Sequence, residues 1–162
     1  LEAPRTTTQL ERMKFISRLA LSVLLSQQAE ACSNILVTKG ASTEETNMIA
    51  YNADSASLYG SLYHYHESDN HDGAMRDVYE WDTGKFLGKI PEAPHTYNVV
   101  GNVNSVGLTI GETTFGGIES LCSQRDAIID YGSLIYLTLQ RASTARQAIK
   151  IMDDLMQVSA NH

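Results

Sequence analysis

The stretch CSNILVTKGASTEETNMIAYNADS, residues 32–55, decides how the fold begins. Its two ends, 32–40 and 47–55, are runs of apolar and β-branched residues typical of strands, and the polar segment 41–46 between them has the character of a turn. The stretch therefore predicts a β-hairpin. Because the second strand returns to the start of the first, Cys32 and Asp54 are expected to be neighbours.

Cys32 directly follows Ala29-Glu30-Ala31, which resembles the small-x-small end of a secretory signal. Upstream, residues 13–31 carry a basic start, a short apolar run and a polar region, so a signal peptide is predicted there; an amphipathic helix is the alternative. The apolar run is too short to span a membrane, so no stable membrane anchor is expected. Residues 1–12 fit neither interpretation. The predicted organisation is a leader over 1–31 and a hydrolase domain over 32–162.

Three roles are open for Cys32 itself. It can be an incidental core cysteine, a lipid attachment point, or a residue that becomes a new N-terminus. Ala29 and the charged Glu30 disfavour the lipid motif, which prefers Leu three residues before the cysteine. The second cysteine, Cys122, allows one disulfide, but spacing alone does not establish it.

The remaining chain changes from β to α. Residues 58–95 predict a long, partly ordered excursion with one short strand at 79–81, and 96–117 predict a second hairpin turning at Asn104-Ser105. Residues 130–142 predict a buried helix. Ser143 is expected to cap a second helix over 144–158, whose apolar positions follow helical spacing: Ala148, Ile149, Met152, Leu155 and Met156.

The predicted fold class is α+β, with one antiparallel sheet and helices on one face. Such a sheet leaves its other face uncovered, so the chain is expected to be the first part of a larger domain. Hydrophobic residues make up 43% of the chain, which indicates a globular protein. After residue 31, 8 basic residues face 16 acidic ones, and this balance disfavours nucleic acid and anionic membranes as partners.

Candidate chemistry centres on Cys32. If cleavage after Ala31 frees its α-amine, the residue carries both a nucleophilic thiol and a base with a reference pKa of about 7.7 to 8.0. Asp54 is a candidate for orienting that amine; an ordinary turn aspartate is the alternative. The stretch HYHESDNHD, 64–72, offers possible metal ligands, but lacks a closed Cys/His spacing, so a solvated acidic loop is favoured and no metal is predicted. The Gly-rich 111–117 lacks the lysine of a phosphate-binding loop.

A family resemblance covers about residues 32–156. It is carried by CSNILVTKGAS (32–42), YNADSASLYGSLYH (51–64), YEWDTGKFLGKIPEAPHTYNVVGNVNSVGLTIGETTFGG (79–117) and IDYGSLIYLTLQRASTARQAIKIM (129–152). These segments resemble the N-terminal part of bacterial dipeptidases of the N-terminal-nucleophile superfamily, relatives of penicillin V acylase and choloylglycine hydrolase.

The resemblance implies an αββα sandwich, here incomplete, in which Cys32 is the nucleophile and Asp54 holds its amino end. Related acylases carry an Arg three residues before this aspartate, where this chain has Tyr51. They also have an Asn oxyanion donor after the second hairpin, so Thr113, Thr114 or a nearby backbone N–H is expected to serve here. The family enzymes are not metal-dependent, and no cofactor is expected.

The predicted function is therefore hydrolysis of dipeptides or short peptides through an acyl-enzyme, by a secreted, periplasmic or cell-envelope bacterial protein. A homo-oligomer is left open. The rival interpretation is a truncated inactive fragment or an exported binding module without catalysis. Signal peptidase and self-cleavage can each expose Cys32, and the Ala29-Glu30-Ala31 context favours signal peptidase.

Overall fold

The computed structural model describes residues 32–53, 60–114, 116–121 and 127–160. The chain divides into two units, Leu1–Ala31 and Cys32–His162, and every described residue belongs to the second. The predicted signal peptide over 13–31, Asp54 and Cys122 therefore lie outside the described residues. Within them, no helix has the length and apolar character needed to cross a membrane.

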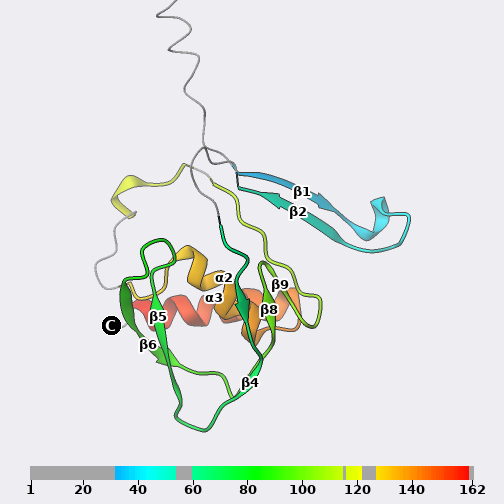
Figure 1. Ribbon diagram of the computed structural model, residues 1–162. Coiled ribbons are helices and arrows are strands. Elements are labelled where there is room, and N and C mark those ends of the chain that lie inside the picture. Colours follow the sequence, from blue (N-terminus) through cyan, green and yellow to red (C-terminus); the bar gives the residue numbers. More distant parts are fainter. Residues whose placement is uncertain (1–31, 54–59, 115, 122–126, 161–162) are drawn as a thin grey trace, which may run out of the picture. The chain divides into compact units, whose positions relative to one another are not determined.

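The described residues form an α+β arrangement of short strands and two helices (Figure 1). The strands are β1 (Ser33–Val37), β2 (Met48–Asn52), β3 (His64–Tyr65), β4 (Ser68–Asp69), β5 (Met75–Tyr79), β6 (Phe86–Pro91), β7 (His95–Thr96), β8 (Val99–Val100) and β9 (Val103–Asn104). The helices are α2 (Tyr131–Arg141) and α3 (Ala145–Ala160), with the short 3₁₀ turns η1 (Lys39–Ala41) and η2 (Glu119–Leu121).

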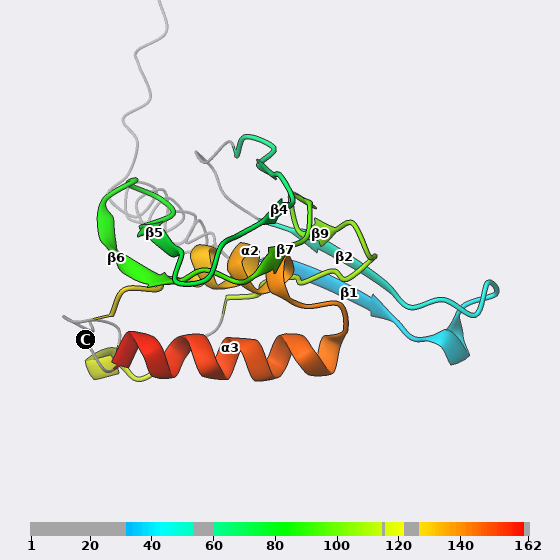
Figure 2. The same cartoon turned by 90° about the horizontal axis from the view of Figure 1, so that it is seen from below.

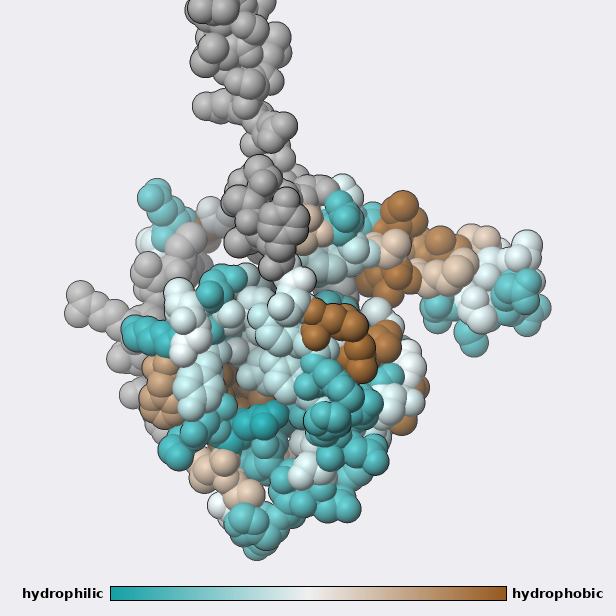
Figure 3. Space-filling model, in the orientation of Figure 1, coloured by the Kyte–Doolittle hydropathy of each residue, from teal (hydrophilic) through white to brown (hydrophobic). Residues whose placement is uncertain are grey.

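Strands β1 and β2 form the predicted antiparallel hairpin, with Ser33 opposite Asn52 and Val37 opposite Met48. The turn between them contains Glu45 at a φ of 51°, the left-handed region. The hairpin pairs with no third strand in the described part of the chain. Ile35 and Leu36 are consequently 65% and 73% exposed, and Figure 3 shows an apolar surface along the hairpin.

The prediction of a single antiparallel sheet is wrong for the described residues. The strands form four small antiparallel sheets: β1–β2, β3–β8–β9, β4–β7 and β5–β6. Every described strand outside the two longer hairpins contains only 2 residues, too short to extend a common ladder.

The predicted excursion over 58–95 is also more ordered than expected. Instead of one strand at 79–81 it contains β3, β4 and the β5–β6 hairpin, and Trp81 lies in the turn after β5. Gly88 in β6 is required by close packing, because a Cβ there would lie 2.8 Å from Ile128 Cγ2. Gly88 therefore allows β6 to pack closely against the core residue Ile128.

The second predicted hairpin is present with a different turn. Strands β8 and β9 reverse at Gly101-Asn102, with Val99 opposite Asn104. The chain then reverses again after Asn104, where Val103 bridges to Thr109. The expected turn at Asn104-Ser105 is thus the second of two consecutive reversals.

Helix α2 is the predicted buried helix, and side chains fix both of its ends. The N-cap residue Asp130 accepts a 2.8 Å hydrogen bond from the Ser133 N–H. At the other end, the buried Asn104 side-chain amide donates to the carbonyls of Leu139 and Ala142 at 2.8 and 2.7 Å. These bonds satisfy carbonyls that the end of a helix leaves without intrahelical partners.

Figure 2 shows α2 between α3 and the strands, so both helices lie on one side of the strands. The core joins the β5–β6 hairpin to the helices through buried side chains: Val78, Ile90, Ile128, Tyr136, Leu137 and Leu155. Gly132 in the first turn of α2 contacts Trp81 so closely that a Cβ would lie 2.4 Å from the indole Cγ. The tryptophan therefore packs directly on the helix backbone.

Helix α3 differs from its prediction in two details. Thr144, and not Ser143, precedes its first residue, and the Thr144 Oγ1 accepts a hydrogen bond of 3.3 Å from the Gln147 N–H. Of its apolar positions, Ala148 and Leu155 are buried and Met152 is half-buried, whereas Ile149 and Met156 are 70% and 50% exposed. The helical spacing therefore predicted the buried side of α3 correctly, but it wrongly included Ile149 and Met156 in that side.

Candidate active site around Cys32

The half-buried side chain of Cys32 lies directly before β1, beside two hydroxyl groups. Its Sγ is 3.5 Å from the Thr114 hydroxyl and 3.8 Å from the Tyr51 hydroxyl. Tyr51 comes from the neighbouring strand β2, whereas Thr114 is 82 residues away in sequence. The site is therefore assembled by tertiary structure and not by the hairpin alone.

The segment carrying Thr114 is held against the hairpin by two close contacts. The Asn34 side-chain amide donates a 2.6 Å hydrogen bond to the backbone carbonyl of Glu112. Gly111 lies so near that a Cβ would be 2.7 Å from Ile49 Cδ1 and 3.2 Å from Asn34 Oδ1. Only glycine permits this approach without a shift of the neighbours, and the approach positions the Thr114 hydroxyl beside the sulfur.

Burial, the hydrogen bond to Cys32 and the nearby Glu112 carboxylate raise the pKa of Tyr51 to about 12. The phenol is therefore neutral around neutral pH and can donate a hydrogen bond to the sulfur. Burial first, and repulsion from Asp82 second, also raise the pKa of Glu112. The surroundings of Cys32 thus offer hydroxyl groups and an acidic side chain, but no described contact of its thiol is basic.

The predicted site residues have different outcomes. Thr113 and Thr114 are both exposed, but only Thr114 has a described contact with the Cys32 sulfur. Asp54 lies outside the described residues. The proximity of Tyr51 was not predicted: it was noted only as a departure from the arginine of related acylases, although its place three residues before Asp54 was the signal.

Several side chains of the histidine-rich stretch 64–72 form contacts in pairs. His64 and His66 lie on one face of the chain with ring centroids 4.0 Å apart, and His64 Nε2 is 2.8 Å from Asn98 Oδ1. Asp69 Oδ1 instead pairs with His95 Nδ1 at 2.8 Å. Across the described residues, no three His, Cys, Asp or Glu side chains converge as metal ligands would.

Comparison with protein families gives one finding. The model of peptidase family C69 matches residues 57–160, well over half of the chain. The match begins after Cys32 and Asp54 and includes Thr114. Searches of curated proteins and of solved structures gave no match. The predicted relation to cysteine dipeptidases is confirmed at the level of the family: the chain belongs to peptidase family C69, a dipeptidase family of cysteine peptidases.

Proposed function

We propose that the chain is a dipeptidase in which Cys32, once residues 1–31 are removed, is the N-terminal nucleophile. The observation that carries the proposal is the position of the Cys32 thiol beside the Thr114 and Tyr51 hydroxyls, in a chain of a cysteine peptidase family. The proposal includes the αββα sandwich of N-terminal-nucleophile hydrolases, with the described hairpins and helices as one part. It also includes export, directed by residues 13–31.

The α-amine of Cys32 is the proposed base, because the two hydroxyls beside the thiol are not basic. Tyr51 is a neutral phenol, since its pKa is raised to about 12. A free α-amine has a reference pKa of about 7.7 to 8.0 and resides on the same residue as the thiol. Before cleavage this nitrogen is an amide and cannot accept a proton. Removal of the leader is thus the proposed activation step, and Asp54 is proposed to hold the amine.

The proposed reaction proceeds in two halves. The amine takes the thiol proton, the sulfur attacks the peptide carbonyl carbon, and the carbonyl oxygen becomes an oxyanion for which Thr114 is the proposed donor. The C–N bond then breaks as the ammonium returns the proton to the leaving amine, which leaves a thioester. Water attacks the thioester and gives a proton to the amine. The C–S bond breaks, the acid departs and the thiol is restored.

The test compares two forms of the protein on a panel of dipeptides. The chain beginning at Cys32 is expected to hydrolyse them, whereas the chain retaining residues 1–31 and the N-acetylated mature chain are not. Cys32→Ala and Cys32→Ser should lower kcat by on the order of 10³-fold or more, as loss of a covalent nucleophile does. Cys122→Ala, at the only other cysteine of the sequence, is the matched control.

Circular dichroism and thermal unfolding of each variant separate lost chemistry from lost folding. Equal turnover by the wild type and by Cys32→Ala would contradict the proposal. A folded chain starting at Cys32 that binds dipeptides without cleaving them would support the exported binding module instead. Intact mass and N-terminal sequencing of the protein exported by a bacterial host test the leader separately, with Cys32 as the expected first residue.

A further inference from the structure

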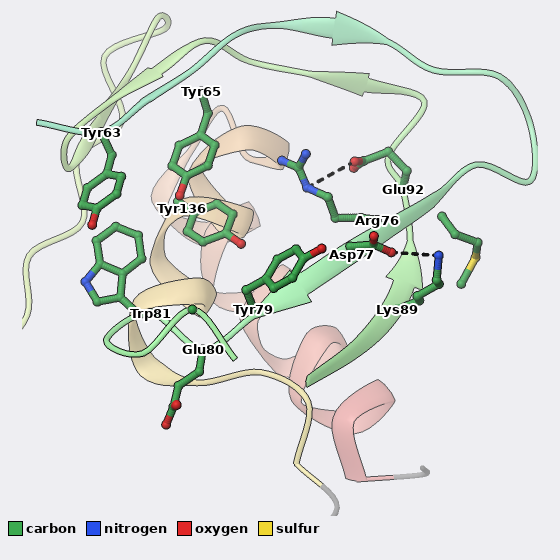
Figure 4. Close-up of a pocket in the computed structure, with 12 residues that line it drawn as sticks. Tyr63, Tyr65, Arg76, Asp77, Tyr79, Glu80, Trp81, Lys89, Glu92 and Tyr136 are labelled. Carbon is green, nitrogen blue, oxygen red and sulfur yellow. Dashed lines mark ion pairs between the residues drawn. The ribbon is translucent and has the colours of Figure 1, made fainter. Parts of the chain in front are cut away.

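A second candidate site is lined by different residues from those that surround Cys32. The β5–β6 hairpin, β3 and α2 line an open pocket of about 680 Å³ (Figure 4). Cys32, Tyr51 and Thr114 are not among its lining residues. The pocket has an aromatic side and a charged side, and the two together indicate the chemistry of a ligand.

The aromatic side is built from four rings in contact. Tyr65 stacks on Tyr136 with ring centroids 4.3 Å apart, and Tyr63 meets Trp81 at 4.3 Å with a tilt of 48°. Trp81 and Tyr136 join the two pairs at 5.9 Å. In Figure 4 these rings form one wall of the pocket. Such a wall favours an apolar or aromatic group, because stacked and tilted ring contacts add to the burial of apolar surface.

The pocket lining has two cations, Arg76 and Lys89, and three carboxylates, Asp77, Glu80 and Glu92, but next to Arg76 a single carboxylate serves two guanidinium groups. Glu92 is shared by two guanidinium groups: its Oε2 is 3.5 Å from Arg76 Nε and its Oε1 is 3.2 Å from Arg141 Nη2. The Arg76 Nη2 also donates to Gln140 Oε1 at 2.6 Å. These contacts leave Arg76 with further N–H donors. The other cation, Lys89, is paired with Asp77 at 2.9 Å.

An anionic group is therefore favoured at Arg76 over a cation. A cationic ligand would gain from the aromatic faces, but it would lie beside a guanidinium whose partner carboxylate is already shared. Arginine binds carboxylates well because its planar donors match their two oxygens. A molecule with a carboxylate next to an apolar side chain fits both sides of the pocket.

We propose that this pocket binds the carboxyl-terminal residue of a peptide, with its α-carboxylate on Arg76 and an apolar or aromatic side chain against Trp81 and Tyr65. That the ligand is a peptide rests on the proposed function. Binding itself does not require Cys32, so the two proposals can fail separately.

The experiment uses the full chain carrying Cys32→Ala, which removes turnover. The sequence contains a single tryptophan, Trp81, so its fluorescence reports on this pocket alone. N-acetylphenylalanine is the probe, and its amide, N-acetylalanine and phenethyltrimethylammonium are the comparisons. The acid is expected to change the fluorescence saturably and to bind at least tenfold more tightly than the amide or the alanine compound.

Arg76→Gln should abolish the preference for the acid over the amide, whereas Arg146→Gln, an exposed arginine of α3, should preserve it. If Arg76→Gln disturbs folding, Glu92→Gln provides a second test, because releasing Arg76 from its carboxylate should tighten binding of the acid. Equal binding of acid and amide, preference for the quaternary ammonium, or unchanged preference in Arg76→Gln would each overturn the proposal.

Discussion

The Asn34 side-chain amide donates a 2.6 Å hydrogen bond to the backbone carbonyl of Glu112, 78 residues later in the sequence. This bond connects the strand that follows Cys32 to the segment that carries Thr114. The geometry around the thiol therefore depends on an amide that does not itself contact the sulfur.

Asn34→Ala is expected to lower the free energy of unfolding by about 1–2 kcal/mol, because it leaves the part-buried Glu112 carbonyl without its donor. It should also lower the turnover of the chain beginning at Cys32, since Thr114 loses its position. Asn47→Ala is the control, because Asn47 accepts a hydrogen bond from the Lys39 N–H in the exposed turn of the same hairpin. Denaturant unfolding and dipeptide kinetics measure both effects, and equal losses in the two variants would contradict a specific role for Asn34.

Thr114→Val removes the hydroxyl beside the Cys32 sulfur and preserves the size of the side chain. If this hydroxyl stabilises the oxyanion, kcat should fall by on the order of 10², at the lower end for loss of one such donor, with little change in KM. Thr113→Val changes the exposed neighbour and serves as the matched control. Steady-state kinetics on the mature chain measure the effect, and similar kcat values for the two variants would show that Thr114 is not a donor.

Raised tyrosine pKa values predict loss of stability at alkaline pH. Burial, with repulsion from Tyr136 as the second cause, raises the pKa of Tyr65 from 10.0 to about 12. Because the folded protein holds this proton more tightly than the unfolded chain, the contribution to stability is complete below pH 10 and is lost as pH rises through about 12. Tyr65→Phe, which cannot ionise, should unfold less steeply with pH over this range.

Urea unfolding at successive pH values, with tyrosinate absorbance, follows this effect. Tyr79→Phe, at a 48% exposed ring, controls for removal of a hydroxyl. An unchanged pH dependence in Tyr65→Phe would show that its phenol is not responsible.

Asp130 supports both α2 and the pocket wall. Its Oδ1 accepts a hydrogen bond from the Ser133 backbone N–H at 2.8 Å, and its Oδ2 accepts one from the Trp81 backbone N–H at 2.6 Å. Asp130→Ala is expected to lower the free energy of unfolding by about 2 kcal/mol or more, because it removes the cap of α2 and also leaves the Trp81 backbone N–H without its acceptor. Asp130→Asn retains one acceptor oxygen and should cost less. Thermal unfolding and the emission of Trp81 report the two effects, and a loss of stability without a change in emission would separate the cap from the pocket.

Local features of the sequence predicted some of the elements whose partners are close in the chain. The β1–β2 hairpin was predicted because apolar runs flank a polar turn, and α2 because an apolar stretch follows Asp130. The β5–β6 hairpin was missed for a physical reason. Its half-buried Arg76 breaks the expected alternation, and Gly88 reflects contact with Ile128 and not a loop.

The candidate site was predictable only in part. Cys32 stood out from its place after a predicted cleavage motif, and Thr114 was named through a family resemblance. No local pattern predicts that Thr114 lies beside Cys32, because Gly111 and the Asn34 bond create that contact across the fold. The contact of Tyr51 with the sulfur was not predicted, because the resemblance marked this position only as one where related acylases have an arginine.

The contact between Gly132 and Trp81 has a further consequence. The indole of Trp81 packs directly on the backbone at Gly132, so no side chain separates the helix from the aromatic wall of the pocket at this position. Any side chain there must push the indole outward, toward the space that a ligand would occupy. A larger residue at position 132 is therefore expected to narrow the pocket from behind, although Gly132 itself does not line it.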